Sequence, residues 1–157
     1  MNLVQAGKKA PEFNLPDQNG KIHKLSDYKG NYKLLYFYPK DDTPGCTKEA
    51  CMLRDNFPVF KKLGITVFGV SADSEKSHKK FEEKYDLPFT LLVDADHKVA
   101  DSYGAWGLKK MMGREYNGMF RVSFLIDGED KIVKVYEKVR PEMHAEEVLA
   151  DLKVFMK

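Results

Sequence analysis

The feature that most constrains the fold is a buried strand followed closely by the start of a helix. Residues 34–38 are Leu-Leu-Tyr-Phe-Tyr, an unbroken apolar run of a length typical of a strand covered on both faces. The helix is predicted to begin after Thr43, a residue type preferred as an N-cap, with Pro44 in the first helical position. A strand and a helix joined by so short a turn predict an α/β protein whose chemistry lies at the carboxyl end of this strand.

The first cysteine of the chain, Cys46, is the third residue of the predicted helix. A thiolate in that position accepts hydrogen bonds from unpaired backbone N–H groups and lies at the positive end of the helix dipole. Both effects favour the charged form, so we expect the pKa of the Cys46 thiol to fall below the free value of about 8.5. Cys46 is therefore predicted to be a nucleophile. The alternative is a small buried residue of the core.

The remaining hydrophobic pattern predicts alternating strands and helices after an N-terminal β-hairpin, whose turn is the Asn-Gly pair at residues 19–20. We expect Pro58 to kink or shorten the helix that follows Cys46. Residues 106–118 are rich in glycine and basic residues without a clear period, so we expect a loop there. The predicted strands are 10–15, 21–25, 33–38, 65–70, 89–93, 120–126 and 131–138, and the predicted helices are 43–62, 74–85, 97–103 and 141–155. This order predicts an α/β fold in one domain, residues 1–157, with a central mixed β-sheet flanked by helices.

The composition bounds the possible functions. Lysine and arginine together number 26 against 24 acidic residues, and a net charge of +2 gives no reason to expect a nucleic-acid partner. No apolar run approaches the roughly 20 residues that cross a membrane, and residues 1–13 lack the apolar centre of a signal peptide. We therefore expect a soluble protein of the cytoplasm. In that reducing compartment two cysteines are more often catalytic, redox-active or metal-binding than structural.

The segment around Cys46 is similar to the active-site signature of a known family. The pattern Pro39-x-x-x-Thr43-x-x-Cys46 resembles that of the peroxiredoxins, and residues 38–51 resemble the peroxiredoxin Q subfamily, also called bacterioferritin comigratory protein. The resemblance runs from about residue 7 to the C-terminus, and it is also carried by residues 103–106, 112–114 and 121–127. It implies a thioredoxin-like fold and the reduction of hydrogen peroxide and organic hydroperoxides, with recycling by thioredoxin or a similar dithiol and without a cofactor or metal.

The resemblance also implies roles for single residues. Cys46 is the peroxidatic nucleophile, Thr43 orients the peroxide through its hydroxyl, and Pro39 shapes the pocket wall. Arg121 supplies a permanent positive charge near the sulfur and the reacting oxygens. Without the resemblance, Arg121 would be interpreted as a solvated charge on a strand, and Thr43 as a cap only. Glu49 lies one turn after Cys46, and two interpretations stay open for it: a solvated residue, or one that holds an arginine at the substrate site.

The second cysteine, Cys51, is predicted to be the resolving residue, which forms an intramolecular disulfide with Cys46. In an intact helix this five-residue spacing turns the two side chains about 140° apart, with Cα atoms roughly 8 to 9 Å apart. A disulfide needs Cα atoms within about 7 Å. The first turns of the helix must therefore unwind, and Gly45 lowers their helix propensity. The alternative is a free structural thiol and regeneration directly by an external thiol.

Other classes of function remain as alternatives to a monomeric peroxidase. A redox sensor would use the same disulfide to control the binding of a partner. A metal-binding module is disfavoured because structural zinc needs four ligands, and the four histidines show no metal-ligand spacing. A general disulfide oxidoreductase usually carries Cys-x-x-Cys, and the spacing here is longer. We expect a monomer, because no long C-terminal extension is visible in the sequence.

Overall fold

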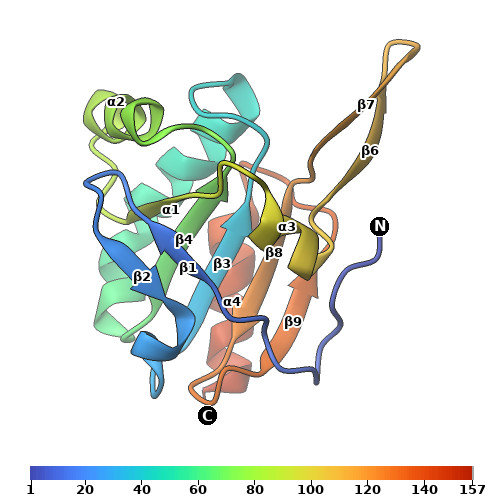
Figure 1. Ribbon diagram of the computed structural model, residues 1–157. Coiled ribbons are helices and arrows are strands. Elements are labelled where there is room, and N and C mark those ends of the chain that lie inside the picture. The colour runs from blue at the N-terminus through green and yellow to red at the C-terminus, as the bar shows by residue number, and fades with distance from the viewer. Residues whose placement is uncertain (157) are drawn as a thin grey trace.

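The computed structural model describes residues 1–156, which are built around a five-stranded mixed β-sheet (Figure 1). Its strands are β3 (Lys33–Phe37), β4 (Thr66–Ser71), β5 (Thr90–Val93), β8 (Val122–Ile126) and β9 (Ile132–Tyr136). The spatial order is β5-β4-β3-β8-β9, so β3, the strand that leads to Cys46, is central. β3, β4 and β5 are parallel, whereas β8 is antiparallel to both β3 and β9. The predicted central mixed sheet is confirmed.

Helices cover both faces of this sheet. One face carries α1 (Pro44–Lys62), α2 (Glu75–Tyr85) and α4 (His144–Phe155), and the other carries α3 (Lys98–Tyr103) and the 3-10 helix η1 (Leu25–Tyr28) (Figure 1). Because successive strand residues point to opposite faces, β3 contributes to two separate cores. Leu34 and Tyr36 pack with the face of α1, and Leu35 and Phe37 pack with the face of α3. Cys46 belongs to the core beneath α1.

The predicted N-terminal hairpin is present, with strands shorter than expected. β1 (Asn14–Pro16) and β2 (Ile22–Lys24) pair antiparallel beside the central sheet. Their turn is held by Asp17, whose Oδ1 accepts hydrogen bonds from two backbone N–H groups, at Asn19 (2.7 Å) and Lys21 (3.0 Å). The turn chemistry therefore determines the position of the hairpin, as the Asn-Gly pair predicted.

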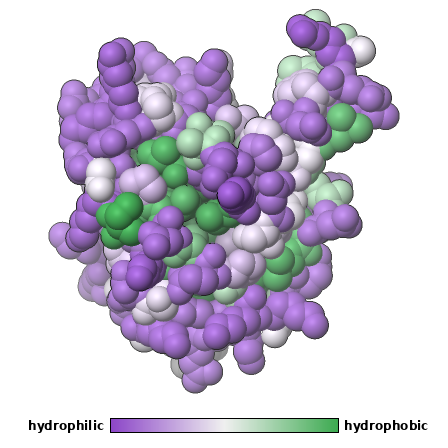
Figure 2. Space-filling view, viewed as in Figure 1, coloured by the Kyte–Doolittle hydropathy of each residue, from purple (hydrophilic) through white to green (hydrophobic). Residues whose placement is uncertain are grey.

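The prediction of a loop at residues 106–118 is wrong. The chain there forms a second hairpin, β6 (Trp106–Met111) and β7 (Arg114–Met119), which projects from the rest of the molecule (Figures 1 and 2). The two turn residues, Met112 and Gly113, both have positive φ, as a tight hairpin turn requires. Most side chains of this hairpin are exposed, so it lacks the alternation of apolar and polar residues by which a half-buried strand is recognised.

The first helix ends where it was predicted to end, but Pro58 does not shorten it. α1 continues through Pro58 to Lys62. Pro58 is exposed, and it removes one backbone hydrogen bond of α1 without ending the helix. No helix among residues 1–156 combines the length and the hydrophobicity needed to cross a membrane.

Candidate active site

The turn between β3 and α1 places the predicted site residues together. α1 begins at Pro44, so Cys46 is its third residue, as predicted. Thr43 holds the N-cap position with extended backbone, but its side chain makes no cap bond. Its hydroxyl instead donates to the carbonyl of Lys40 at 2.8 Å. A hydroxyl committed as a donor in this way keeps its lone pairs free to accept a hydrogen bond from a ligand. Pro39 lies half-buried in the same turn.

The sulfur of Cys46 is buried but faces a positive charge. The residue is 1% exposed and packs in the core beneath α1. Arg121, which immediately precedes β8, donates from Nη2 to the Cys46 sulfur at 3.4 Å. β8 lies next to β3 in the sheet, and this pairing brings together two residues that are 75 positions apart. A cysteine that served only to fill the core would not have a guanidinium directed at its sulfur.

Glu49 holds the other side of this guanidinium. Arg121 donates from Nη1 to Glu49 Oε1 at 2.8 Å, and Glu49 is 1% exposed, so the interpretation of Glu49 as a solvated residue is wrong. Burial raises the pKa of Glu49 from 4.5 to about 7, although the charge and the hydrogen bond of Arg121 act in the opposite direction. Partial burial also lowers the pKa of Arg121, but the neighbouring Cys46 and Glu49 charges outweigh it, so the net shift is upward.

Gly45 explains how the arginine reaches the sulfur. A Cβ atom at residue 45 would lie 2.9 Å from Arg121 Nη2 and 3.9 Å from Pro141 Cγ. A side chain there would displace the guanidinium from the start of α1. The glycine of the Pro-Gly-Cys segment therefore leaves space for the cation that contacts Cys46.

The sequence reasoning missed a buried polar cluster behind the active-site turn. Asp41 accepts hydrogen bonds from the hydroxyls of Tyr38 (2.5 Å) and Ser77 (2.8 Å), and its Oδ2 lies 2.7 Å from Nδ1 of His78. The other ring nitrogen of His78 bonds to the carbonyl of Leu92 at 2.8 Å. These bonds fasten the turn to α2 and β5. Two adjacent aspartates between a buried strand and a helix are the signal that could have pointed to this cluster.

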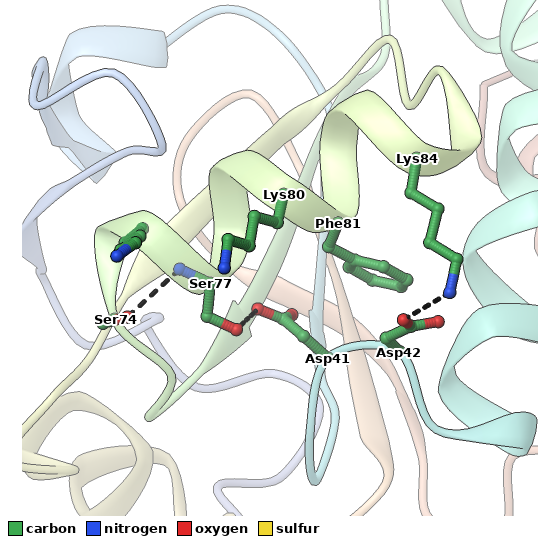
Figure 3. Close-up of a pocket in the computed structure, with 8 residues that line it drawn as sticks. Asp41, Asp42, Ser74, Ser77, Lys80, Phe81 and Lys84 are labelled. Carbon is green, nitrogen blue, oxygen red and sulfur yellow. Dashed lines mark hydrogen bonds and ion pairs between the residues drawn. The ribbon is translucent and has the colours of Figure 1, made fainter.

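The second of those aspartates, Asp42, connects the turn to the C-terminal end of α2. Its carboxylate accepts from the ammonium of Lys84 at 2.7 Å and from the hydroxyl of Tyr85 at 2.7 Å. Asp41 and Asp42 lie below α2 in Figure 3. They line a hollow of about 500 Å³, together with Lys76 and Lys80. This hollow is not lined by Cys46 or Arg121.

One group of residues has the composition of a metal site. Asp41, Asp73 and His78 place possible ligand atoms within 4.8 Å of one another. These atoms, however, are engaged by protein donors: Asp73 Oδ2 accepts from the hydroxyl of Ser71 at 2.6 Å and from the backbone N–H of Asp41 at 2.8 Å. The cluster is therefore explained by hydrogen bonding alone.

Cys51 lies two turns further into α1 than the start of the helix. It is half-buried, and both cysteines are free thiols in this structure. Because α1 is continuous from Pro44 to Lys62, the two thiols are separated by helix geometry as the sequence predicted.

The fold and this site define a thiol-dependent oxidoreductase with a thioredoxin-like fold, and comparison with known proteins agrees. The chain belongs to the AhpC/TSA family, whose model matches residues 6–135. It is 50% identical to peroxiredoxin Bcp of Bacillus subtilis over 150 residues, which is 96% of each chain. It is 48% identical to peroxiredoxin Bcp of Escherichia coli over 153 residues, which is 98% of each chain.

Solved structures give the same result. The bacterioferritin comigratory protein of Xanthomonas campestris, described with alkyl peroxide reduction activity, superposes with a TM-score of 0.90 at 35% identity, covering 97% of this chain and 99% of the other. A variant of PrxQ from Xylella fastidiosa superposes with a TM-score of 0.92 at 32% identity, covering 100% of this chain and 99% of the other. The resemblance to peroxiredoxins of the Bcp or Q type is thereby confirmed, and the protein is an enzyme of the peroxidase class.

Proposed function

We propose that the protein reduces hydrogen peroxide and organic hydroperoxides with the Cys46 thiolate as nucleophile. The sulfur attacks the terminal peroxide oxygen, an S–O bond forms while the O–O bond breaks, and water or an alcohol leaves after taking up a proton. The sulfur is oxidised by two electrons to a sulfenic acid. Thr43 accepts a hydrogen bond from the peroxide O–H, Arg121 stabilises the charge that develops on the leaving oxygen, and Pro39 shields the sulfur.

The contact between Arg121 and Cys46 is the observation that carries this proposal. The guanidinium lies 3.4 Å from the sulfur and 2.8 Å from Glu49, so its orientation is set by a buried carboxylate. An arginine held in this way meets the thiolate before the reaction and the leaving oxygen during it, without a large rearrangement. Glu49 therefore acts on the substrate through Arg121.

The second half of the cycle uses Cys51. Its thiol attacks the sulfenic sulfur of Cys46, water leaves, and an intramolecular disulfide forms. Because both residues lie in one continuous helix, the first turns of α1 must unwind for the sulfurs to meet. A dithiol such as thioredoxin then reduces the disulfide and is itself oxidised. We also propose that the protein works as a monomeric domain in the cytoplasm, where the surroundings keep both thiols reduced.

The test is peroxide consumption coupled to thioredoxin and its reductase, with Cys46→Ser and Cys51→Ser variants. We expect Cys46→Ser to abolish turnover, because the nucleophile is lost. Cys51→Ser should consume one equivalent of peroxide per protein and then recycle slowly. Full turnover in Cys46→Ser would overturn the assignment of the nucleophile. Rapid oxidation without recycling by any dithiol, in the unmodified protein, would favour a redox sensor.

A further inference from the structure

Cys46 and Glu49 share one buried cation. The guanidinium of Arg121 donates from Nη2 to the Cys46 sulfur at 3.4 Å and from Nη1 to Glu49 Oε1 at 2.8 Å. Cys46 and Glu49 are each 1% exposed. They are three residues apart in α1, so their side chains are neighbours on one face of the helix. A thiolate and a carboxylate in these positions repel each other, and one positive charge cannot neutralise both.

The second carboxyl oxygen of Glu49 indicates which of the two groups keeps a proton. Oε2 is buried and has no hydrogen-bond partner within residues 1–156. A buried carboxylate oxygen without a donor is costly, whereas a protonated carboxyl group carries no net charge. Burial raises the pKa of Glu49 to about 7, and a thiolate at Cys46 would act in the same direction. The charges therefore balance when Cys46 is a thiolate, Arg121 is charged and Glu49 is protonated.

Two other titratable groups face this site from neighbouring elements, and neither can exchange the proton. Tyr36, on β3, is buried, and burial together with the charges of Glu49 and Cys46 raises the pKa of its hydroxyl well above the ordinary value, so it stays protonated. His144, at the start of α4, is also buried. Burial lowers the pKa of its ring and outweighs the opposite effect of Glu147, so the ring stays neutral.

We propose that Glu49 supplies the proton of the peroxidase reaction: its carboxyl group is protonated while Cys46 is a thiolate and ionises once the sulfur has been oxidised. The thiolate attacks the terminal oxygen, the sulfur gains a hydroxyl group, and the electron pair of the broken O–O bond stays on the leaving oxygen. Because the sulfur is then uncharged, Arg121 pairs with Glu49 alone. The proton that Glu49 loses converts the leaving alkoxide or hydroxide to an alcohol or water.

The reductive half of the cycle returns the proton. Once a dithiol has reduced the disulfide, the Cys46 thiol gives its proton to Glu49 as the thiolate re-forms. Glu49 acts through Arg121 and through charge, so it is a positioning residue and not a catalytic one. This inference rests on the proposed peroxidase function and adds the source of a proton to it.

The experiment counts protons in the Cys51→Ser variant, in which oxidation stops at the sulfenic acid. One equivalent of hydrogen peroxide is added at pH 8 in weak buffer with an indicator dye, and the ultraviolet absorbance of the thiolate is followed in parallel. We expect no more than about half a proton to be taken up per thiolate lost. Adding Glu49→Gln, which keeps an oxygen acceptor for Arg121 but cannot ionise, should raise the uptake about twofold, to about one proton.

Infrared difference spectra identify the group that loses the proton. Oxidation of Cys51→Ser should replace a carboxylic acid band by carboxylate bands. This change should be absent when Glu49→Gln is added and retained with the exposed Glu142→Gln as control. Lys109, whose ammonium donates to the carbonyl of Met119 at 2.9 Å, is the other possible proton donor, and Lys109→Gln should leave the proton uptake unchanged.

Three results would overturn the proposal: equal proton uptake with and without Glu49→Gln, an acid band that persists after oxidation, or an uptake that changes with Lys109→Gln instead. The infrared result needs only the Cys51→Ser protein, so it decides the question even where Glu49→Gln does not fold. Failure of peroxide to consume the thiolate would instead overturn the proposed peroxidase function.

Discussion

At the residue scale, Glu49 forms an ion pair with Arg121 but is buried, where a charged carboxylate is poorly solvated. One carboxylate oxygen accepts from Arg121, whereas Oε2 is buried without a hydrogen-bond partner among residues 1–156. Taking a carboxylate out of water disfavours its charged form, which is why the pKa of Glu49 rises to about 7 despite the arginine. The carboxylate that orients Arg121 is therefore held at a cost in stability.

That cost should appear in the pH dependence of stability. Between about pH 4.5 and 7, folded Glu49 retains a proton that the unfolded chain has released, so the free energy of unfolding should fall as the pH rises. Glu49→Gln lacks this titration. We expect its stability relative to the unmodified protein to increase by about 2 to 3 kcal/mol between pH 5 and pH 8. Urea unfolding at the two pH values measures this difference, with the exposed Glu142→Gln as control. Parallel pH profiles for Glu49→Gln and the unmodified protein would refute it.

At the scale of elements, the start of α1 is fastened to the end of α2. Asp42 receives hydrogen bonds from Lys84 and Tyr85, and Arg54, further along α1, donates from Nη1 to the backbone carbonyl of Tyr85 at 2.7 Å. The segment between these attachments contains both cysteines. If its first turns unwind for disulfide formation, the bonds of Asp42 restrain them.

Weakening this attachment should therefore speed the formation of the disulfide. Asp42 has φ of 56°, a conformation that asparagine tolerates well, so Asp42→Asn removes the charge with little backbone strain. We expect the disulfide to form about two to five times faster after a single addition of peroxide, since exposed ion pairs contribute little. Faster amide exchange at residues 44–51 should accompany it. Asp96→Asn, in the surface pair with Lys98, is the control. An unchanged rate with unchanged exchange would show that Asp42 does not restrain the helix.

At the scale of the whole molecule, one buried ion pair joins the central strand to the β8–β9 connection. Lys33, at the start of β3, is 0% exposed, and its ammonium contacts Asp130 Oδ1 at 2.6 Å and the carbonyl of Asp127 at 2.9 Å. Removing one partner leaves the other charge buried and unpaired, which costs about 3 to 5 kcal/mol.

We expect Lys33→Met to lower the free energy of unfolding by about this amount. The double variant Lys33→Met/Asp130→Asn should recover part of the loss, because no unpaired charge then remains. Asparagine also suits the positive φ of residue 130. Urea unfolding of the two variants provides the measurement, and the exposed Lys131→Met is the control. An equally unstable double variant would show that packing, rather than charge, accounts for the loss.

Local chemistry explains which parts of this molecule could be predicted from the sequence. The β3–α1 junction follows from a short apolar run, a proline and a capping residue type, all within a dozen positions. The burial of Glu49 could not be predicted, because it depends on α1 packing against the sheet and on Arg121, 72 residues away. The β6–β7 hairpin could not be predicted either, because too few of its side chains are buried to give its sequence a hydrophobic period.

The missing side chain at residue 45 has a consequence for the timing of the cycle. The guanidinium of Arg121 occupies the space above Gly45 and contacts Cys46 and Glu49, so its surroundings belong to the first two turns of α1. If the helix start opens to form the proposed disulfide, Arg121 loses its contact with the Cys46 sulfur. Under the proposed cycle, we expect a dead time after each peroxide molecule, which lasts until the reductant has reduced the disulfide and the first turn has re-formed.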